Sequence, residues 1–151
     1  MLKKIFILVM ILAMSGVVSA SESIYPKHLN GDKDFVLAWG HTGVGTYVKK
    51  SSINVKRYAP PIYIISARAY LGNEDGKILG NYYATFKYDY DGRQMYIEMD
   101  SGDWKVLYPQ YTDAINAESR AFGEMVFYIA YRIPFFGSAG GFNENFYSAA
   151  D

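Results

Sequence analysis

Apolar and polar residues alternate along the middle of the chain, and this alternation predicts consecutive β-strands. The clearest strand is expected over 78–90, where residues of one parity are apolar or aromatic: Tyr82, Ala84, Phe86, Tyr88 and Tyr90. Further strands are expected over 35–39, 44–48, 62–71, 94–100 and 104–107. Turn residues such as Asp75-Gly76 and Asp91-Gly92 separate them. The pattern therefore predicts an antiparallel β-meander of five or six strands, with one buried and one wet face.

The spacing of apolar residues changes after residue 107. Apolar side chains now recur every three or four positions, at Phe122, Met125, Val126, Ile129 and Ile133. Asn116 or Ser119 could cap the start of this helix, and Pro134 would end it. We therefore expect an α+β fold in which a C-terminal helix over 117–132 covers the apolar face of the sheet. The tail from residue 135 could form a last strand docked on the sheet, or a disordered end.

The N-terminus has the three parts of an export signal. Lys3 and Lys4 precede an unbroken apolar run over 5–14, and small residues follow at Val18 and Ala20. The run is too short to span a bilayer, which takes about 20 apolar residues in a helix. We therefore expect a signal peptide over 1–20. Cleavage would leave one exported domain over 21–151, with a flexible leader over 21–33, in the periplasm, at the cell surface or secreted.

Composition narrows the classes of function. Cleavage after Ala20 would remove two of the 15 basic residues and none of the 15 acidic ones, so the remaining chain would carry a net charge of −2. Nothing in this balance suggests nucleic acid as a partner, because that needs a clustered basic surface. The chain contains no cysteine, which excludes a lipidated-cysteine anchor, thiolate catalysis and a cysteine zinc site. The apolar stretch over 121–136 should not span a membrane, because Glu124, Arg132 and Pro134 interrupt it.

No motif predicts a catalytic, cofactor-binding or metal site. His41 lies in a glycine-rich turn and has no second ligand at suitable spacing. The glycines around it join two antiparallel strands, whereas a phosphate loop joins a strand to a helix. Four acids cluster around two hairpin turns: Asp89, Asp91, Asp100 and Asp103. Paired carboxylates can hydrolyse glycosides, but aspartate is also an ordinary turn residue, so we expect no catalytic role for them.

The polar face of the predicted sheet is the candidate binding surface. Strand parity places five residues on the face opposite the helix: Arg68, Tyr70, Tyr83, Lys87 and Tyr96. Tyrosine and arginine are enriched at protein–protein hot spots. We therefore hypothesise that these residues bind a protein, of the envelope or of the extracellular matrix. The alternative is a solvated face on which Arg68 or Lys87 pairs with Glu98 across strands.

The segment over 39–53 resembles the opening of the surface-adhesin protein E-like domains. A tryptophan-bearing strand and a glycine-rich turn lead into Tyr47-Val48-Lys49-Lys50-Ser51-Ser52-Ile53, with Lys49 where the family usually has an acid. The pattern from Tyr88 through Tyr96 to Trp104 is similar to that of small exported proteins of unknown function. The resemblance implies an antiparallel sheet with a helix packed on it, and binding to host proteins.

Taken together, these patterns predict an exported, non-enzymatic binding or adhesion-type protein of the bacterial cell envelope. A small envelope hydrolase that uses the turn carboxylates is one alternative. A structural periplasmic protein without a ligand is the other.

Overall fold

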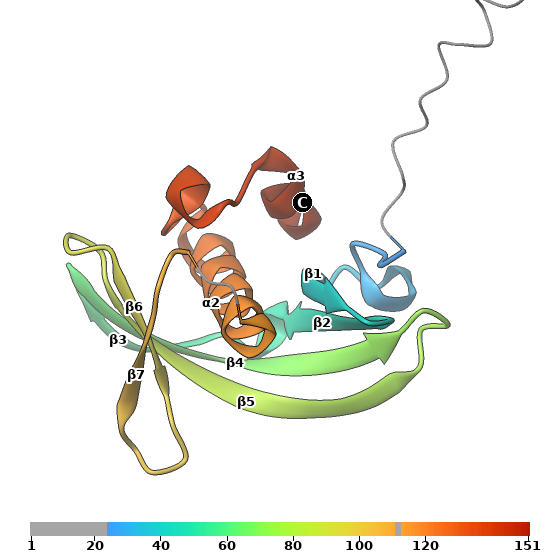
Figure 1. Ribbon diagram of the computed structural model, residues 1–151, viewed down its shortest axis with the longest axis horizontal. Helices are drawn as coiled ribbons and strands as arrows, with labels where there is room; N and C mark the ends of the chain where they lie inside the picture. Colours follow the sequence, from blue (N-terminus) through green and yellow to red (C-terminus); the bar gives the residue numbers. More distant parts are fainter. Residues whose placement is uncertain (1–23, 111–112) are drawn as a thin grey trace, which may run out of the picture.

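The computed structural model describes residues 24–110 and 113–151, so the predicted signal peptide lies outside the described residues. Seven strands form one antiparallel sheet (Figure 1): β1 (Phe35–His41), β2 (Val44–Lys49), β3 (Asn54–Ala59), β4 (Ile62–Asn73), β5 (Ile78–Asp89), β6 (Gln94–Glu98) and β7 (Trp104–Leu107). The strand order is β1-β2-β4-β5-β6-β7, and β3 pairs with β4 outside this path. The antiparallel sheet is confirmed, but the prediction of five or six strands was too low.

The missed strand is β3, which shares one edge of β4 with β2. The last part of β4 pairs with β2, from Ala69 to Asn73, and its first part pairs with β3, from Ile62 to Ser66. All six side chains of β3 are exposed. A strand without a buried face shows no apolar–polar alternation, and this is why the sequence pattern does not indicate it.

The predicted helix is α2 (Ala114–Tyr131), which lies against the concave side of the curved sheet (Figure 1). Its middle, 121–127, is buried on every residue. The helix begins three residues earlier than predicted, because the carboxylate of Asp113, rather than Asn116 or Ser119, accepts the N–H of Ile115. It ends at Tyr131, and its C-cap, Arg132, adopts a left-handed conformation two residues before Pro134.

The parity predicted for β5 is confirmed, since Ala84, Phe86 and Tyr88 face α2 and are buried. Tyr88 is fully buried, and its hydroxyl donates to the carbonyl of Gly123 at 2.7 Å. Gly123 allows this close approach because a Cβ there would lie 2.6 Å from Met95 Sδ and 2.9 Å from the Phe86 ring. The helix and the sheet are therefore in close contact at the centre of the core.

The C-terminal tail is neither of the two forms that the sequence suggests. It folds into η3 (Gly137–Gly140), α3 (Glu144–Tyr147) and η4 (Ser148–Ala150), on the side of α2 away from β4 and β5 (Figure 1). Phe135, Phe142 and Ala150 are buried there. The tail thus adds a third layer over the helix.

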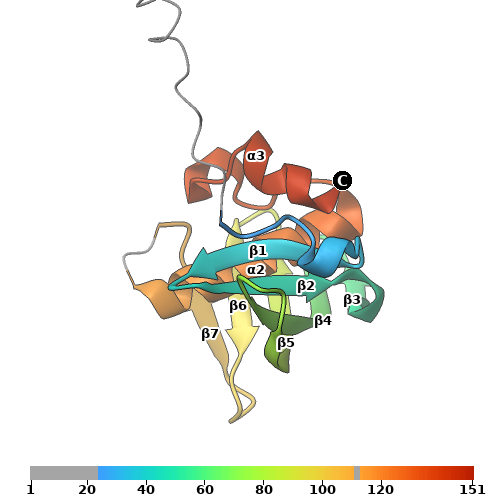
Figure 2. The same ribbon diagram turned by 90° about the vertical axis from the view of Figure 1, so that its right-hand side faces the viewer.

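The N-terminal part of the described chain is also built into the fold. The segment before β1 contains η1 (Leu29–Gly31) and runs beside β1 (Figure 2). Leu29 is buried, Tyr47 donates its hydroxyl to the carbonyl of Pro26 at 3.0 Å, and the Tyr25 hydroxyl accepts the N–H of Gly43 at 2.9 Å. The prediction of a flexible leader over 21–33 is therefore wrong for its described residues, 24–33.

Among the described helices, none is both long enough and apolar enough to cross a membrane.

Candidate functional site

The candidate site is the face of the sheet turned away from α2, which we call the convex face. All five residues predicted for the binding surface have the parity of this face, since the residues between them, such as Ala67, Ala69 and Ala84, are buried against the helix side. Figure 1 shows this side of β4 and β5 free of any helix.

Arg68 and Tyr83 form a stacked pair in the middle of the convex face. The two residues are cross-strand neighbours on β4 and β5, and the guanidinium carbon of Arg68 lies 3.9 Å from the Tyr83 ring centroid. Arg68 also donates to the side-chain oxygen of Asn81 at 2.5 Å. Its planar group is therefore held at two points, while Tyr83 is still 62 % exposed.

Lys87 forms a second cluster with two aromatic rings. Its ammonium lies 4.6 Å from the ring centroid of Tyr96 and 4.9 Å from that of Trp104. Trp104 is not among the residues predicted for the site. The pairing of Trp104 with Glu98, two residues after Tyr96 on β6, places it on the same face. That register joins three strands and is not visible in the sequence of any one of them.

Tyr70 belongs to a third cluster, near the first hairpin. Its ring meets Phe35 edge to face with centroids 5.1 Å apart, and the Lys49 ammonium lies 5.7 Å from the Tyr70 ring and 5.9 Å from the Phe35 ring. The structure thus distributes the five predicted residues over three cation–aromatic clusters. The sequence reasoning missed Phe35 and Lys49 because it did not place the first hairpin beside β4.

The cross-strand ion pairs of the alternative interpretation are not formed. Within the described residues, the one ion pair joins Arg132 to Asp151 at 3.3 Å, far from this face in the fold. Arg68 and Lys87 face aromatic rings rather than Glu98. The positive charge of both side chains is therefore not neutralised by a carboxylate in contact with them.

The turn acids of the alternative enzyme hypothesis are divided between the two ends of β6. Asp89 and Asp91 flank the turn before β6, whereas Asp100 and Asp103 lie in the turn after it. A five-residue strand separates these turns by about 16 Å. Asp89 accepts the N–H of Gly92 at 3.0 Å, which is an ordinary turn contact. The four carboxylates do not converge on one site.

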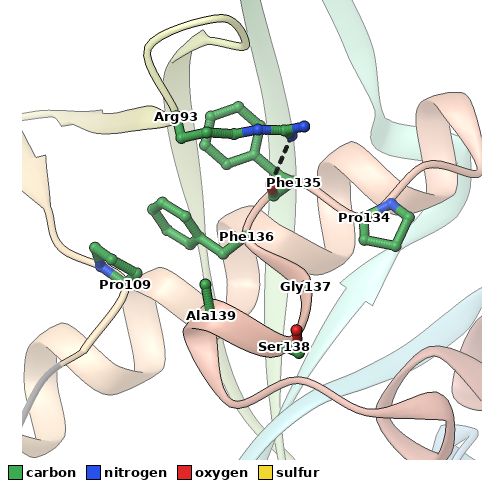
Figure 3. A pocket seen from close by; sticks show the side chains of 8 residues that line it. All are labelled: Arg93, Pro109, Pro134, Phe135, Phe136, Gly137, Ser138 and Ala139. Atoms are coloured by element: carbon green, nitrogen blue, oxygen red, sulfur yellow. Dashed lines mark hydrogen bonds between the residues drawn. The ribbon is translucent and has the colours of Figure 1, made fainter.

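Other parts of the described chain offer little for catalysis. An open hollow of about 370 Å³ lies between the turn before β6 and the segment after α2, and Figure 3 shows its lining. Arg93 donates there to the carbonyl of Phe135 at 2.9 Å, and no acid or histidine is among the lining residues. His41 is exposed at the end of β1, and no group of three or more potential metal ligands occurs in the described residues.

Comparison with known protein families, with curated proteins and with solved structures finds no match to this chain.

Proposed function

We propose that this chain is an exported, non-enzymatic binding module of the bacterial cell envelope and that its convex face contacts a partner protein. The observation that carries the proposal is the set of three cation–aromatic clusters on one face of one sheet. Each contains a lysine or arginine that faces aromatic rings: Lys49, Arg68 and Lys87. These side chains are held before any partner arrives.

A preordered aromatic surface is well suited to protein binding. Tyrosine, tryptophan and arginine supply most hot-spot energy, and a side chain that is already fixed loses little conformational entropy on binding. Tyr83 and Tyr96 lie on the adjacent strands β5 and β6, each beside a cation. The face combines a large aromatic contact area with positive charges that no carboxylate contacts.

Two features of the sequence support the envelope location and the adhesion-type role. The N-terminal residues have the pattern of an export signal. The resemblance of 39–53 to surface-adhesin protein E-like domains implies binding to host proteins. The chain has no cysteine to carry the lipid that anchors the family's adhesin. We therefore propose a protein that is periplasmic, associated with the cell surface or released.

The test is a binding measurement on the chain expressed with its own N-terminal segment and tagged at its C-terminus. Purified envelope and extracellular-matrix proteins are immobilised, and the affinity of each is measured by interferometry. For any protein that binds, the double variant Tyr83→Ala, Tyr96→Ala should bind at least thirtyfold more weakly, because loss of one hot spot costs about 2 kcal/mol.

Tyr58→Ala is the matched control. Tyr58 is 67 % exposed, close to the 62 % of Tyr83, but its ring packs against Tyr63 and Tyr131 on the helix side of the sheet. It should leave the affinity unchanged. If the double variant is folded by circular dichroism and binds as tightly as the parent, the convex face is merely solvated and the proposal is wrong.

A further inference from the structure

The convex face contains a hollow of about 430 Å³ beside the Arg68–Tyr83 pair. Three strands and the segment before β3 line it, through six residues: Ser52, Asn54, Lys56, Ser66, Tyr83 and Thr85. Its floor is a row of short polar side chains across the sheet, because Asn54 pairs with Ser66 and Ser66 pairs with Thr85. The short side chains of Ser66 and Thr85 lie between the longer ones of Lys56 and Tyr83, and this difference in length leaves the hollow.

Most of the polar groups in the lining have no partner within the protein. Ser52 is engaged, since its hydroxyl donates to the Lys49 carbonyl and accepts the N–H of Arg68. The side chains of Asn54, Lys56, Ser66 and Thr85 make no hydrogen bond or ion pair with any described residue. Ser66 is only 6 % exposed. Its hydroxyl is still reached by solvent, so a ligand atom that enters the hollow can replace the water bound there.

The charge of the lining selects the kind of ligand. It contains one cation, Lys56, and no carboxylate. Arg68 stacks on Tyr83, which itself lines the hollow, so a second positive charge lies beside it. An amide N–H, two hydroxyls and an ammonium can all donate to the same anionic group, and hydrogen bonds to a charged acceptor are roughly twice as strong as neutral ones.

We infer that this hollow receives a carboxylate side chain from an acidic segment of the partner protein. The inference rests on the proposed function, because it names the chemistry by which the same face recognises its partner. The carboxylate would accept from Lys56, with Asn54, Ser66 and Thr85 around it. The neighbouring Tyr83 and Arg68 would contact the adjoining part of the acidic segment.

The first experiment uses a deca-glutamate peptide as the probe and the ¹⁵N-labelled protein as the reporter. At low salt the peptide should shift the amide resonances of Asn54, Ser66 and Thr85, and a deca-lysine peptide should not. Lys56→Glu should weaken peptide binding about tenfold or more, because the attraction becomes a repulsion. The control Lys77→Glu makes the same charge change at an exposed residue in the β4–β5 turn and should have little effect.

A second measurement separates this inference from the proposed function. If Lys56→Glu leaves both peptide and partner binding unchanged while Tyr96→Ala weakens partner binding, the face is an interface but the hollow is not a carboxylate site. If neither variant affects any partner, the proposed function is also wrong. If maltoheptaose, a neutral oligosaccharide, shifts the same amides and the glutamate peptide does not, the hollow is a saccharide site and the inference is overturned.

Discussion

At the scale of single residues, Glu124 has the most consequential environment in the core. Its side chain is fully buried on α2. It accepts the backbone N–H groups of Phe135 and Phe136 at 2.8 Å and the hydroxyl of Tyr147 at 2.7 Å. Burial of a carboxylate is costly unless such donors replace water. One side chain therefore fixes both the segment that follows α2 and helix α3.

We expect Glu124→Gln to destabilise the fold. The amide of glutamine would present an N–H where a carboxylate oxygen now accepts one, so a buried donor would lose its partner. The free energy of unfolding should fall by about 2–3 kcal/mol, measured by urea denaturation. Glu74→Gln, at an exposed turn residue, should change it by less than about 0.5 kcal/mol. Equal stability of both variants would show that these hydrogen bonds contribute nothing.

Glu124 also shows why part of the structure could not be predicted. In the sequence it interrupts the apolar stretch over 121–136 and argues against a membrane-spanning segment there. Its backbone partners lie 11–13 residues later, and their position depends on how the chain turns after Arg132. Hydropathy patterns carry no information about such turns. This is why the tail was expected to be a strand or disordered rather than a packed layer.

At the scale of elements, the apolar stripe of α2 is predicted better than its ends. Met125 and Val126 are fully buried, whereas Ile129 is only partly buried and Ile133 is 45 % exposed. The period of 3.6 identifies the helix and its buried face. The ends depend on a single cap and a single left-handed residue, and several polar residues near the start could have served as the cap.

Docking of α2 on the sheet can be tested with two substitutions on the same helix. Met125→Ala removes a fully buried side chain and should lower the free energy of unfolding by about 2–5 kcal/mol. Ile115→Ala removes a side chain that is 74 % exposed and should change it by less than about 0.5 kcal/mol. Thermal or urea unfolding followed by circular dichroism measures both. Similar values for the two variants would mean that the helix is not packed as described.

The convex face follows from strand parity, and for that reason its residues could be predicted. A residue's face depends only on whether its number in the strand is odd or even, provided no bulge intervenes. Parity does not predict which residues are neighbours on that face, because this depends on which strands pair and in which register. Trp104, Phe35 and Lys49 were missed for this reason, and so was the hollow that β3 completes.

At the scale of the whole molecule, tyrosines that are buried, such as Tyr47 and Tyr88, or partly shielded from water, such as Tyr82 and Tyr147, make the fold less stable at alkaline pH. Burial raises the pKa of Tyr47 to about 12, with a smaller contribution from Tyr25. Burial also raises the pKa of Tyr82, Tyr88 and Tyr147, and nearby Glu118 or Glu124 raises them further. In the unfolded chain these hydroxyls would ionise near pH 10.

Above pH 10 the folded state therefore holds more protons than the unfolded state, and stability falls as pH rises. The stabilisation is fully present below pH 10 and is lost progressively as the pH rises above 10, with the contribution of Tyr47 lost by about pH 12. Thermal melts at successive pH values, with tyrosinate absorbance recorded in parallel, should show part of the absorbance change developing only as the fold is lost. Ionisation of every tyrosine near pH 10 in a protein that stays folded would contradict this expectation.

The arrangement of strands has a consequence for folding kinetics. Every pairing in the sheet except β2 with β4 joins strands that are consecutive in the chain. Most of the sheet can therefore form as successive hairpins, whose short loops cost little entropy to close. The contacts of α2 with β1, in contrast, join segments separated by more than 70 residues. Short-range pairing speeds folding, and long-range contacts slow it. The meander over β4–β7 is therefore expected to form early, and the first hairpin to be enclosed last, when α2 and the C-terminal tail close over it.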